Sequence, residues 1–214
     1  MIYSENILIC IIVPLVVLMV FLPGKTRRLV GGLIIGMVVS LMGAYLNGYF
    51  SAIYNMDATL TARYISPMIE EIMKFLPIML YLLLFDPDNS ELIGFSASIG
   101  AGFATFENCC YITQNGAQLI QLTLVRGLSV GIMHVECGLV IGICFLLVKR
   151  YKSIMIPGMI GAFSFAMSIH SLYNLLVSVD GLAAYLGFGA PLIILALLYF
   201  SWQKSQNEAI EQEE

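Results

Sequence analysis

The sequence predicts an all-α protein, a polytopic membrane helix bundle of about seven transmembrane helices. Of its 214 residues, 59% are hydrophobic and only 11% are charged, whereas an average soluble domain has roughly 25% charged residues. The mean hydropathy is +0.90. A soluble domain must keep much of its surface polar, so this composition excludes soluble enzymes. The net charge of −4, without a basic stripe, excludes nucleic acid as a partner.

Seven apolar stretches are long enough to cross a bilayer, which takes about 20 helical residues. Turn-forming residues separate several of them, as at Pro23-Gly24 and at Asp180-Gly181. The predicted spans are 6–22, 29–55, 64–85, 92–114, 118–148, 154–179 and 182–202. They form one domain over residues 1–204, and residues 205–214 form a short acidic tail.

The positions of the basic residues predict the orientation in the bilayer. Lys25, Arg27 and Arg28 follow the first span, and loops rich in lysine and arginine stay in the cytoplasm. The N-terminus is therefore predicted outside and the C-terminus inside. The same orientation places a second basic group in the cytoplasm, namely Lys149, Arg150, Lys152 and Lys204.

Ionisable side chains inside the predicted spans are the candidate functional residues, because one charge at mid-bilayer costs about 2.5–3.5 kcal/mol. They are Glu70, Glu71, Lys74, Glu107, Arg126, His134, Glu136 and His170. Glu70, Glu107, His134 and His170 each lie about two turns below the outer end of their spans, with Asn174 one turn above His170. A shared depth on four helices predicts one site near the extracytoplasmic face.

Helical spacing suggests which side chains face one another. Lys74 follows Glu70 by four residues and Glu71 by three, so either carboxylate can reach its ammonium, and Lys74 is expected to be a structural counter-ion. His134 and His170 lie on stripes of small residues, which are surfaces that pack against other helices.

Two further charged residues are left outside this site. Glu136 lies on nearly the opposite helix face from His134, and no partner for it is identified. Arg126 is interpreted as an anchor at the membrane interface.

Carboxylates, imidazoles and an amide in one site can activate water in two ways. In the first, a glutamate is the general base, a histidine protonates the leaving amine, and Asn174 donates to the oxyanion. In the second, two histidines and one or two glutamates hold zinc or another divalent metal. Both predict hydrolysis of a substrate that reaches the outer half of the bilayer.

Four motifs in this order resemble the PrsW family of intramembrane proteases. That family is similar in turn to the CAAX-processing and bacteriocin-processing membrane proteases. The motifs are Glu70-Glu71-Ile72-Met73-Lys74, Phe103-Ala104-Thr105-Phe106-Glu107, His134, and His170-Ser171-Leu172-Tyr173-Asn174. Against the wider group, Lys74 stands one position before the arginine of EExxxR, and Glu107 stands where CAAX-type enzymes have histidine.

The resemblance implies a protease of the bacterial plasma membrane. Its substrate would be a single-span membrane protein, an anti-sigma factor, which it would cut on the extracytoplasmic side as the site-1 step of regulated proteolysis. By analogy with the wider group, Glu70 is the base and Glu71 is the partner of Lys74. The classification of the family with metalloproteases implies a divalent metal such as zinc, with Glu107, His134 and His170 as its candidate ligands, while a strict requirement for a metal stays open.

Other functions remain possible from the sequence. A proton-coupled transporter or a sensor would use the same buried glutamate, histidine and lysine side chains. The segment from Gly127 to Gly131 fits the GxSxG pattern of serine hydrolases. However, that pattern needs a strand-to-helix turn, and Ser129 and His134 point about 140° apart on one helix. The sequence does not indicate an oligomeric state.

Overall fold

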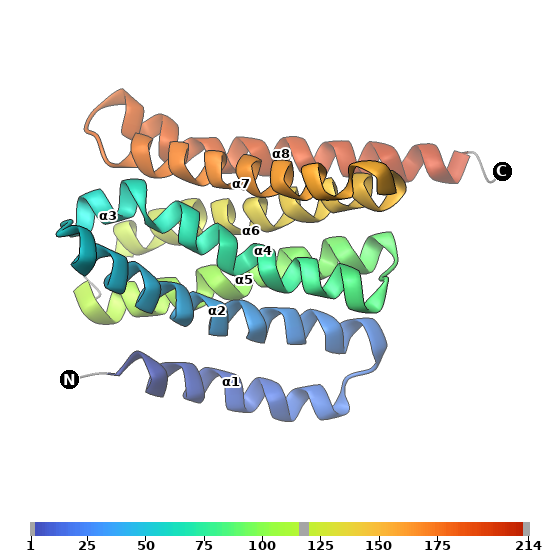
Figure 1. The fold of residues 1–214 in the computed structure, drawn as a ribbon, viewed down its shortest axis with the longest axis horizontal. Helices are drawn as coiled ribbons and strands as arrows, with labels where there is room; N and C mark the ends of the chain where they lie inside the picture. The colour runs from blue at the N-terminus through green and yellow to red at the C-terminus, as the bar shows by residue number, and fades with distance from the viewer. Residues whose placement is uncertain (1–2, 116–119, 212–214) are drawn as a thin grey trace.

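The fold is a bundle of α-helices, seen in a computed structural model that describes residues 3–115 and 120–211 (Figure 1). Within these ranges every regular element is helical, which confirms the predicted fold class. The helices are α1 (Ser4–Phe21), α2 (Gly24–Tyr54), α3 (Ala58–Tyr64), α4 (Ser66–Phe85), α5 (Asn89–Asn115), α6 (Ile120–Arg150), α7 (Met155–Val177) and α8 (Leu182–Glu211). A single 3₁₀ turn, η1 (Lys152–Ile154), precedes α7.

Five of the described helices are long and apolar enough to cross a membrane, namely α1, α2, α6, α7 and α8. The other two predicted spans correspond to α4 and α5, which are not among these five; α4 carries three charged residues, Glu70, Glu71 and Lys74, and α5 carries Glu91 and Glu107. Both are embedded in the bundle, and α5 lies between α2 and α6. The start of α1 and the end of α8 lie at opposite ends of the bundle (Figure 1), as an odd number of crossings requires.

The helix boundaries differ from the prediction in two places. The short helix α3 was not predicted; Asp57 caps it by accepting a 2.8 Å hydrogen bond from the backbone N–H of Leu60. Helix α8 continues past the predicted end of the last span, and its Leu182–Glu211 range includes most of the acidic tail. Residues 118–119 of the predicted fifth span and 212–214 of the tail lie outside the described residues.

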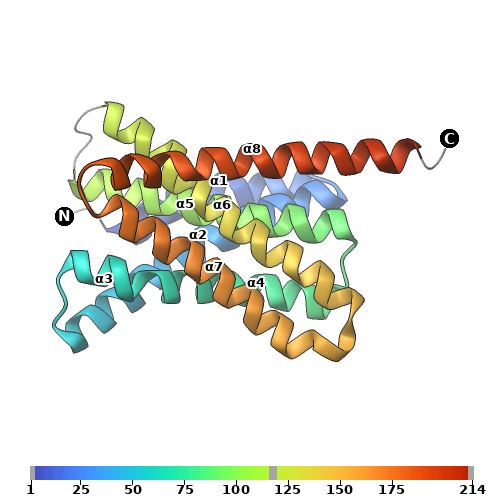
Figure 2. The ribbon, with the colours of Figure 1, turned by 90° about the horizontal axis from the view of Figure 1, so that it is seen from above.

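Close packing of α2, α5 and α6 builds the centre of the bundle (Figure 2). A Cβ atom at Gly36 would clash with the backbone of α5 at Ile99, and one at Gly100 would clash with the backbone carbonyl of His134 on α6. Both positions therefore require glycine. The contact at Gly100 fixes α6 against α5 at the residue that enters the functional site.

Candidate functional site

A cavity of about 600 Å³ lies at the end of the bundle that carries α3, and helices α3 to α7 line it. The structure brings most of the predicted site residues to its wall. These are Glu70 on α4, Glu107 on α5, His134 on α6, and His170 and Asn174 on α7. The remaining one, Glu71, is fully buried beside them, in contact with His170.

Glu71 lies between Lys74 and His170. The Lys74 ammonium donates to Glu71 Oε1 over 2.5 Å, and His170 Nδ1 lies 2.6 Å from the same oxygen. Neither Glu71 nor Lys74 has exposed side-chain surface. A carboxylate only accepts hydrogen bonds, so the proton of a neutral His170 is on Nδ1 and its Nε2 carries a free lone pair.

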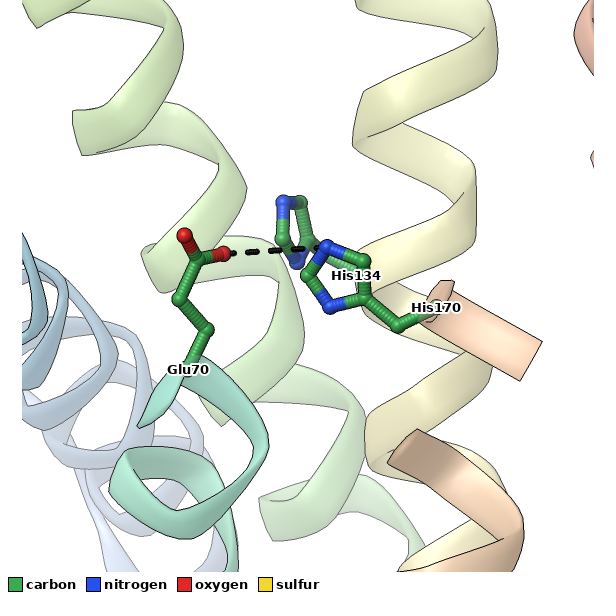
Figure 3. Close-up of side chains that lie close together, drawn as sticks. All are labelled: Glu70, His134 and His170. Atoms are coloured by element: carbon green, nitrogen blue, oxygen red, sulfur yellow. Dashed lines mark ion pairs between the residues drawn. The ribbon is translucent and has the colours of Figure 1, made fainter. Parts of the chain in front are cut away.

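Glu70 points into the cavity toward the two histidines (Figure 3). The side-chain amide of Asn47, on α2, donates to Glu70 Oε1 over 3.0 Å. The other oxygen, Oε2, lies 3.8 Å from His170 Nε2, which is too long for a direct hydrogen bond. The carboxylate of Glu70 and the lone pair of His170 are thus two acceptors that face a common space.

His134 lies between a cation and an anion. Its Nδ1 is 2.9 Å from the Lys74 ammonium, and its Nε2 is 2.5 Å from Glu107 Oε2. Because an ammonium only donates, Nδ1 is the acceptor and the proton of a neutral His134 is on Nε2. Glu107 is held in turn by Arg126 at 2.6 Å, and the Arg126 guanidinium stacks on Tyr111.

Asn174 connects α7 to α3 across the mouth of the cavity. Its side-chain amide donates to the backbone carbonyl of Ala62 over 2.8 Å. Arg63 makes a second connection, donating to the hydroxyl and carbonyl oxygens of Ser178 at 2.8 and 2.9 Å. A side-chain amide has two N–H groups, so one can stay on Ala62 while the other is available for the predicted role of Asn174 as an oxyanion donor.

The geometry around Ser129 does not support a serine hydrolase. Ser129 is buried within α6, and its hydroxyl is 2.8 Å from the hydroxyl of Tyr173. No strand precedes it among the described residues, so the turn that GxSxG requires is not formed.

The sequence model of the PrsW family intramembrane metalloproteases matches residues 13–201, almost the whole chain. The chain belongs to the PrsW family. Membership makes it a multi-pass membrane protein and an intramembrane protease, and it confirms the resemblance drawn from the motifs. No curated protein and no solved structure gives a significant match.

The residues of this PrsW-family protein fit a divalent metal. Glu70, His134 and His170 each offer a ligand atom, and these atoms lie within 4.8 Å of one another (Figure 3). Two histidines and a glutamate are a donor set that zinc accepts. The contact of Glu71 with His170 Nδ1 is of the kind that would orient this histidine if it held a metal. The metal ligands predicted from the sequence were Glu107, His134 and His170, whereas the structure groups the two histidines with Glu70.

Glu107 has a different position from the one that the sequence suggested. It contacts His134 rather than completing the group with both histidines. Ligation through Nε2 of His134 requires loss of the proton there, and Glu107 Oε2 is placed to receive it.

Two residues of the site were missed or misinterpreted from the sequence. Asn47 is a polar side chain inside the second predicted span, and that alone could have singled it out. Arg126 was interpreted as an interface anchor, but it lines the cavity and pairs with Glu107. An acidic partner on a neighbouring helix cannot be identified without knowing how the helices pack.

Proposed function

We propose that this PrsW-family protease hydrolyses a peptide bond of a single-span membrane protein, an anti-sigma factor, as a site-1 cut in a bacterial plasma membrane. The observation that carries this proposal is the pair of open acceptors, Glu70 and His170 Nε2, which face one cavity at 3.8 Å. Helix α3, which lines the cavity, lies at the same end of the bundle as the start of α1 (Figure 1). By the basic-residue prediction, that end is extracytoplasmic.

Glu71 and Lys74 prepare His170 for this role. The carboxylate of Glu71 keeps the His170 proton on Nδ1, and Lys74 compensates the buried charge of Glu71. His170 Nε2 is then an acceptor for a water proton, in the way that a carboxylate orients a catalytic histidine elsewhere. This assigns Glu71 the partner role and leaves Glu70 free to be the base.

Glu70 is positioned to take a proton from water. Asn47 holds one carboxylate oxygen, and the other faces the cavity. These acid–base roles apply without a metal, and in that route the leaving amine can receive a proton through His134, which contacts Glu107 and through it Arg126. In the alternative route, Glu70, His134 and His170 would be the ligands of a divalent metal, which would supply Lewis-acid polarisation of water or of the scissile carbonyl.

The test is co-expression with epitope-tagged, single-span anti-sigma factors, with fragment size read by blot. Glu70→Gln, Glu71→Gln and His170→Ala are expected to abolish a fragment cut near the outer membrane face. The matched control is Glu91→Gln, because Glu91 is a glutamate of α5 that pairs with Arg28 far from the cavity. This control should cleave like the wild type at equal expression.

Two results would contradict the proposal. Cleavage that survives in Glu70→Gln and His170→Ala alike would remove these residues from the chemistry. Uncut substrate with well-folded wild-type protein, across anti-sigma factors and other tagged membrane peptides, would instead favour proton-coupled transport, which flux measurements in liposomes would detect.

A further inference from the structure

A second cavity, of about 110 Å³, lies between α6, α7 and α8, on the other side of α6 from Glu107. Glu136 provides its carboxyl group, and this residue is 1% exposed. The rest of the lining is apolar apart from Tyr173, whose hydroxyl already contacts Ser129. The proposed chemistry does not use Glu136.

Glu136 is a buried carboxyl group without a protein partner. Neither oxygen has a hydrogen-bond partner among the residues that the structure describes. The backbone N–H of Leu195, on α8, is the group that approaches the carboxyl. A buried polar group that lacks hydrogen bonds is costly. The cavity is the space from which further partners for Glu136 can come.

A proline in α8 gives the lining a second candidate partner for water. Gly187 and Pro191 of α8 both line it. Proline has no N–H, so the carbonyl of Gly187, four residues earlier, lacks its usual helical donor. A buried water needs two to four polar partners and roughly 10–15 Å³ of such space. Glu136 and Gly187 supply the partners, and the volume is ample for several water molecules.

The second cavity adjoins the active-site cavity. Met133 and Tyr173 line both of them and form the wall that they share. Glu136 follows His134 by two residues, a rise of only about 3 Å along the helix. The two cavities therefore lie at the same depth in the bundle.

We propose that Glu136 holds a small water cluster in the second cavity and that this cluster supplies water to the active site past Met133 and Tyr173. Each hydrolysed peptide bond consumes one water molecule, and only Met133 and Tyr173 separate the second cavity from the cavity where it is consumed. The supply role rests on the proposed hydrolytic function, whereas the water site itself does not.

The water site is tested by hydroxyl-radical labelling of the full chain in nanodiscs, read by mass spectrometry. Ile169→Met introduces an oxidisable side chain on a wall that belongs to the second cavity and not to the first. Radicals formed from bound water oxidise such a side chain. Met37 is the internal reference, because it is 2% exposed on α2 and lines neither cavity.

We expect the reporter side chain of Ile169→Met to be labelled strongly, and its labelling to fall to that of Met37 when Glu136→Leu is added. Glu136→Gln should keep it, because an amide still binds water. Ala190→Leu is a second variant that fills the cavity from α8 without removing the carboxyl group. It should also abolish the labelling, which keeps the test valid if Glu136→Leu fails to fold.

Two results would overturn the water site. In the first, the Ile169→Met variant alone is labelled no more strongly at residue 169 than at Met37. In the second, adding Glu136→Leu or Ala190→Leu leaves the labelling at residue 169 unchanged. The supply role is tested separately on a cleaved substrate. There Glu136→Leu should lower kcat and leave KM unchanged, with Glu136→Gln close to the wild type. A Glu136-dependent water site with an unchanged kcat in Glu136→Leu would overturn the supply role alone.

Discussion

The ion pairs at the two ends of the bundle have the same chemistry in opposite surroundings. At the cavity end, Glu71 and Lys74 are 2.5 Å apart, and neither side chain is exposed. At the other end, Lys25 and Asp88 are 2.7 Å apart, with 62% and 53% of their side-chain surface exposed. If one residue of the buried pair is removed, the other keeps an uncompensated charge in the interior. If one residue of the exposed pair is removed, water solvates the charge that remains.

The comparison shows which end of the bundle buries charged side chains, at a cost in desolvation energy. Three ion pairs, each with at least one side chain that is half exposed or more, hold α2 and α6 against the α4–α5 connection and the start of α5: Lys25–Asp88, Arg28–Glu91 and Lys149–Asp86. The cavity end holds its charges inside the bundle instead. Buried charges in a membrane protein mark functional sites, so the buried end is where the chemistry is expected.

Loss of Lys74 should produce the largest effect. Lys74→Met leaves Glu71 buried without its cation, so the free energy of unfolding should fall by about 3–5 kcal/mol. The measurement is the thermal unfolding midpoint in detergent. Lys74→Met with Glu71→Gln removes both charges and should recover much of the lost stability. If Lys74→Met alone unfolds at the wild-type midpoint, the buried Glu71 does not need the Lys74 cation for stability.

Asn47 should affect activity more than stability. Asn47→Ala frees one oxygen of Glu70, and the loss of such an orienting contact lowers activity about 10–100-fold. The measurement is kcat on a cleaved substrate, together with the unfolding midpoint. Asn6→Ala, in the exposed start of α1, is the matched control. Equal kcat values in the two variants would exclude a positioning role for Asn47.

The connection between Asn174 and α3 should have an intermediate effect. One hydrogen bond contributes about 0.5–1.5 kcal/mol, so Asn174→Ala should raise the open population of α3 roughly threefold to tenfold. Limited chymotrypsin digestion after Tyr64, which is 68% exposed at the end of α3, reads this opening as a faster cut. Arg63→Gln should act in the same direction. An unchanged digestion rate in both variants would show that these hydrogen bonds do not hold α3 against α7.

The exposed pair should give the smallest effect. Asp88→Asn is expected to leave the unfolding midpoint at neutral pH almost unchanged. The hydrogen bond from Lys25 holds the pKa of Asp88 below its usual range, so any contribution is present above the ordinary aspartate pKa of about 3.9. It is lost as the pH falls through the folded-state pKa. A midpoint difference from wild type that grows below pH about 4 would contradict this sign.

The sequence predicts well the depth at which the polar residues of the site lie in the bundle, because that depth follows from the number of residues between each one and the end of its span. Glu70, Glu107, His134 and His170 were placed at one level from their distance to the span ends, and the structure gathers them around one cavity. Their chemical roles stay predictions.

The sequence could not show which contacts form across helices. Spacing allowed Lys74 to pair with Glu70 or Glu71, and only the packing of α7 places His170 on Glu71 and leaves Glu70 open. Helix α3 was missed because it lies almost wholly in the connection between the predicted spans 29–55 and 64–85, and its seven residues are too few for a search for membrane spans to detect. The hydrogen bond between Asn47 and Glu70 joins two helices, and the two residues are 23 positions apart in the sequence. Local sequence patterns do not relate residues that far apart.

Reconstituted cleavage in liposomes tests the central claim most directly. The purified chain would be incubated with a single-span anti-sigma substrate, and the products would be mapped by mass spectrometry for Glu70→Gln and Glu91→Gln. The account predicts that Glu91→Gln makes the wild-type cut near the extracytoplasmic face and that Glu70→Gln makes none. Equal cleavage by the two variants would contradict it.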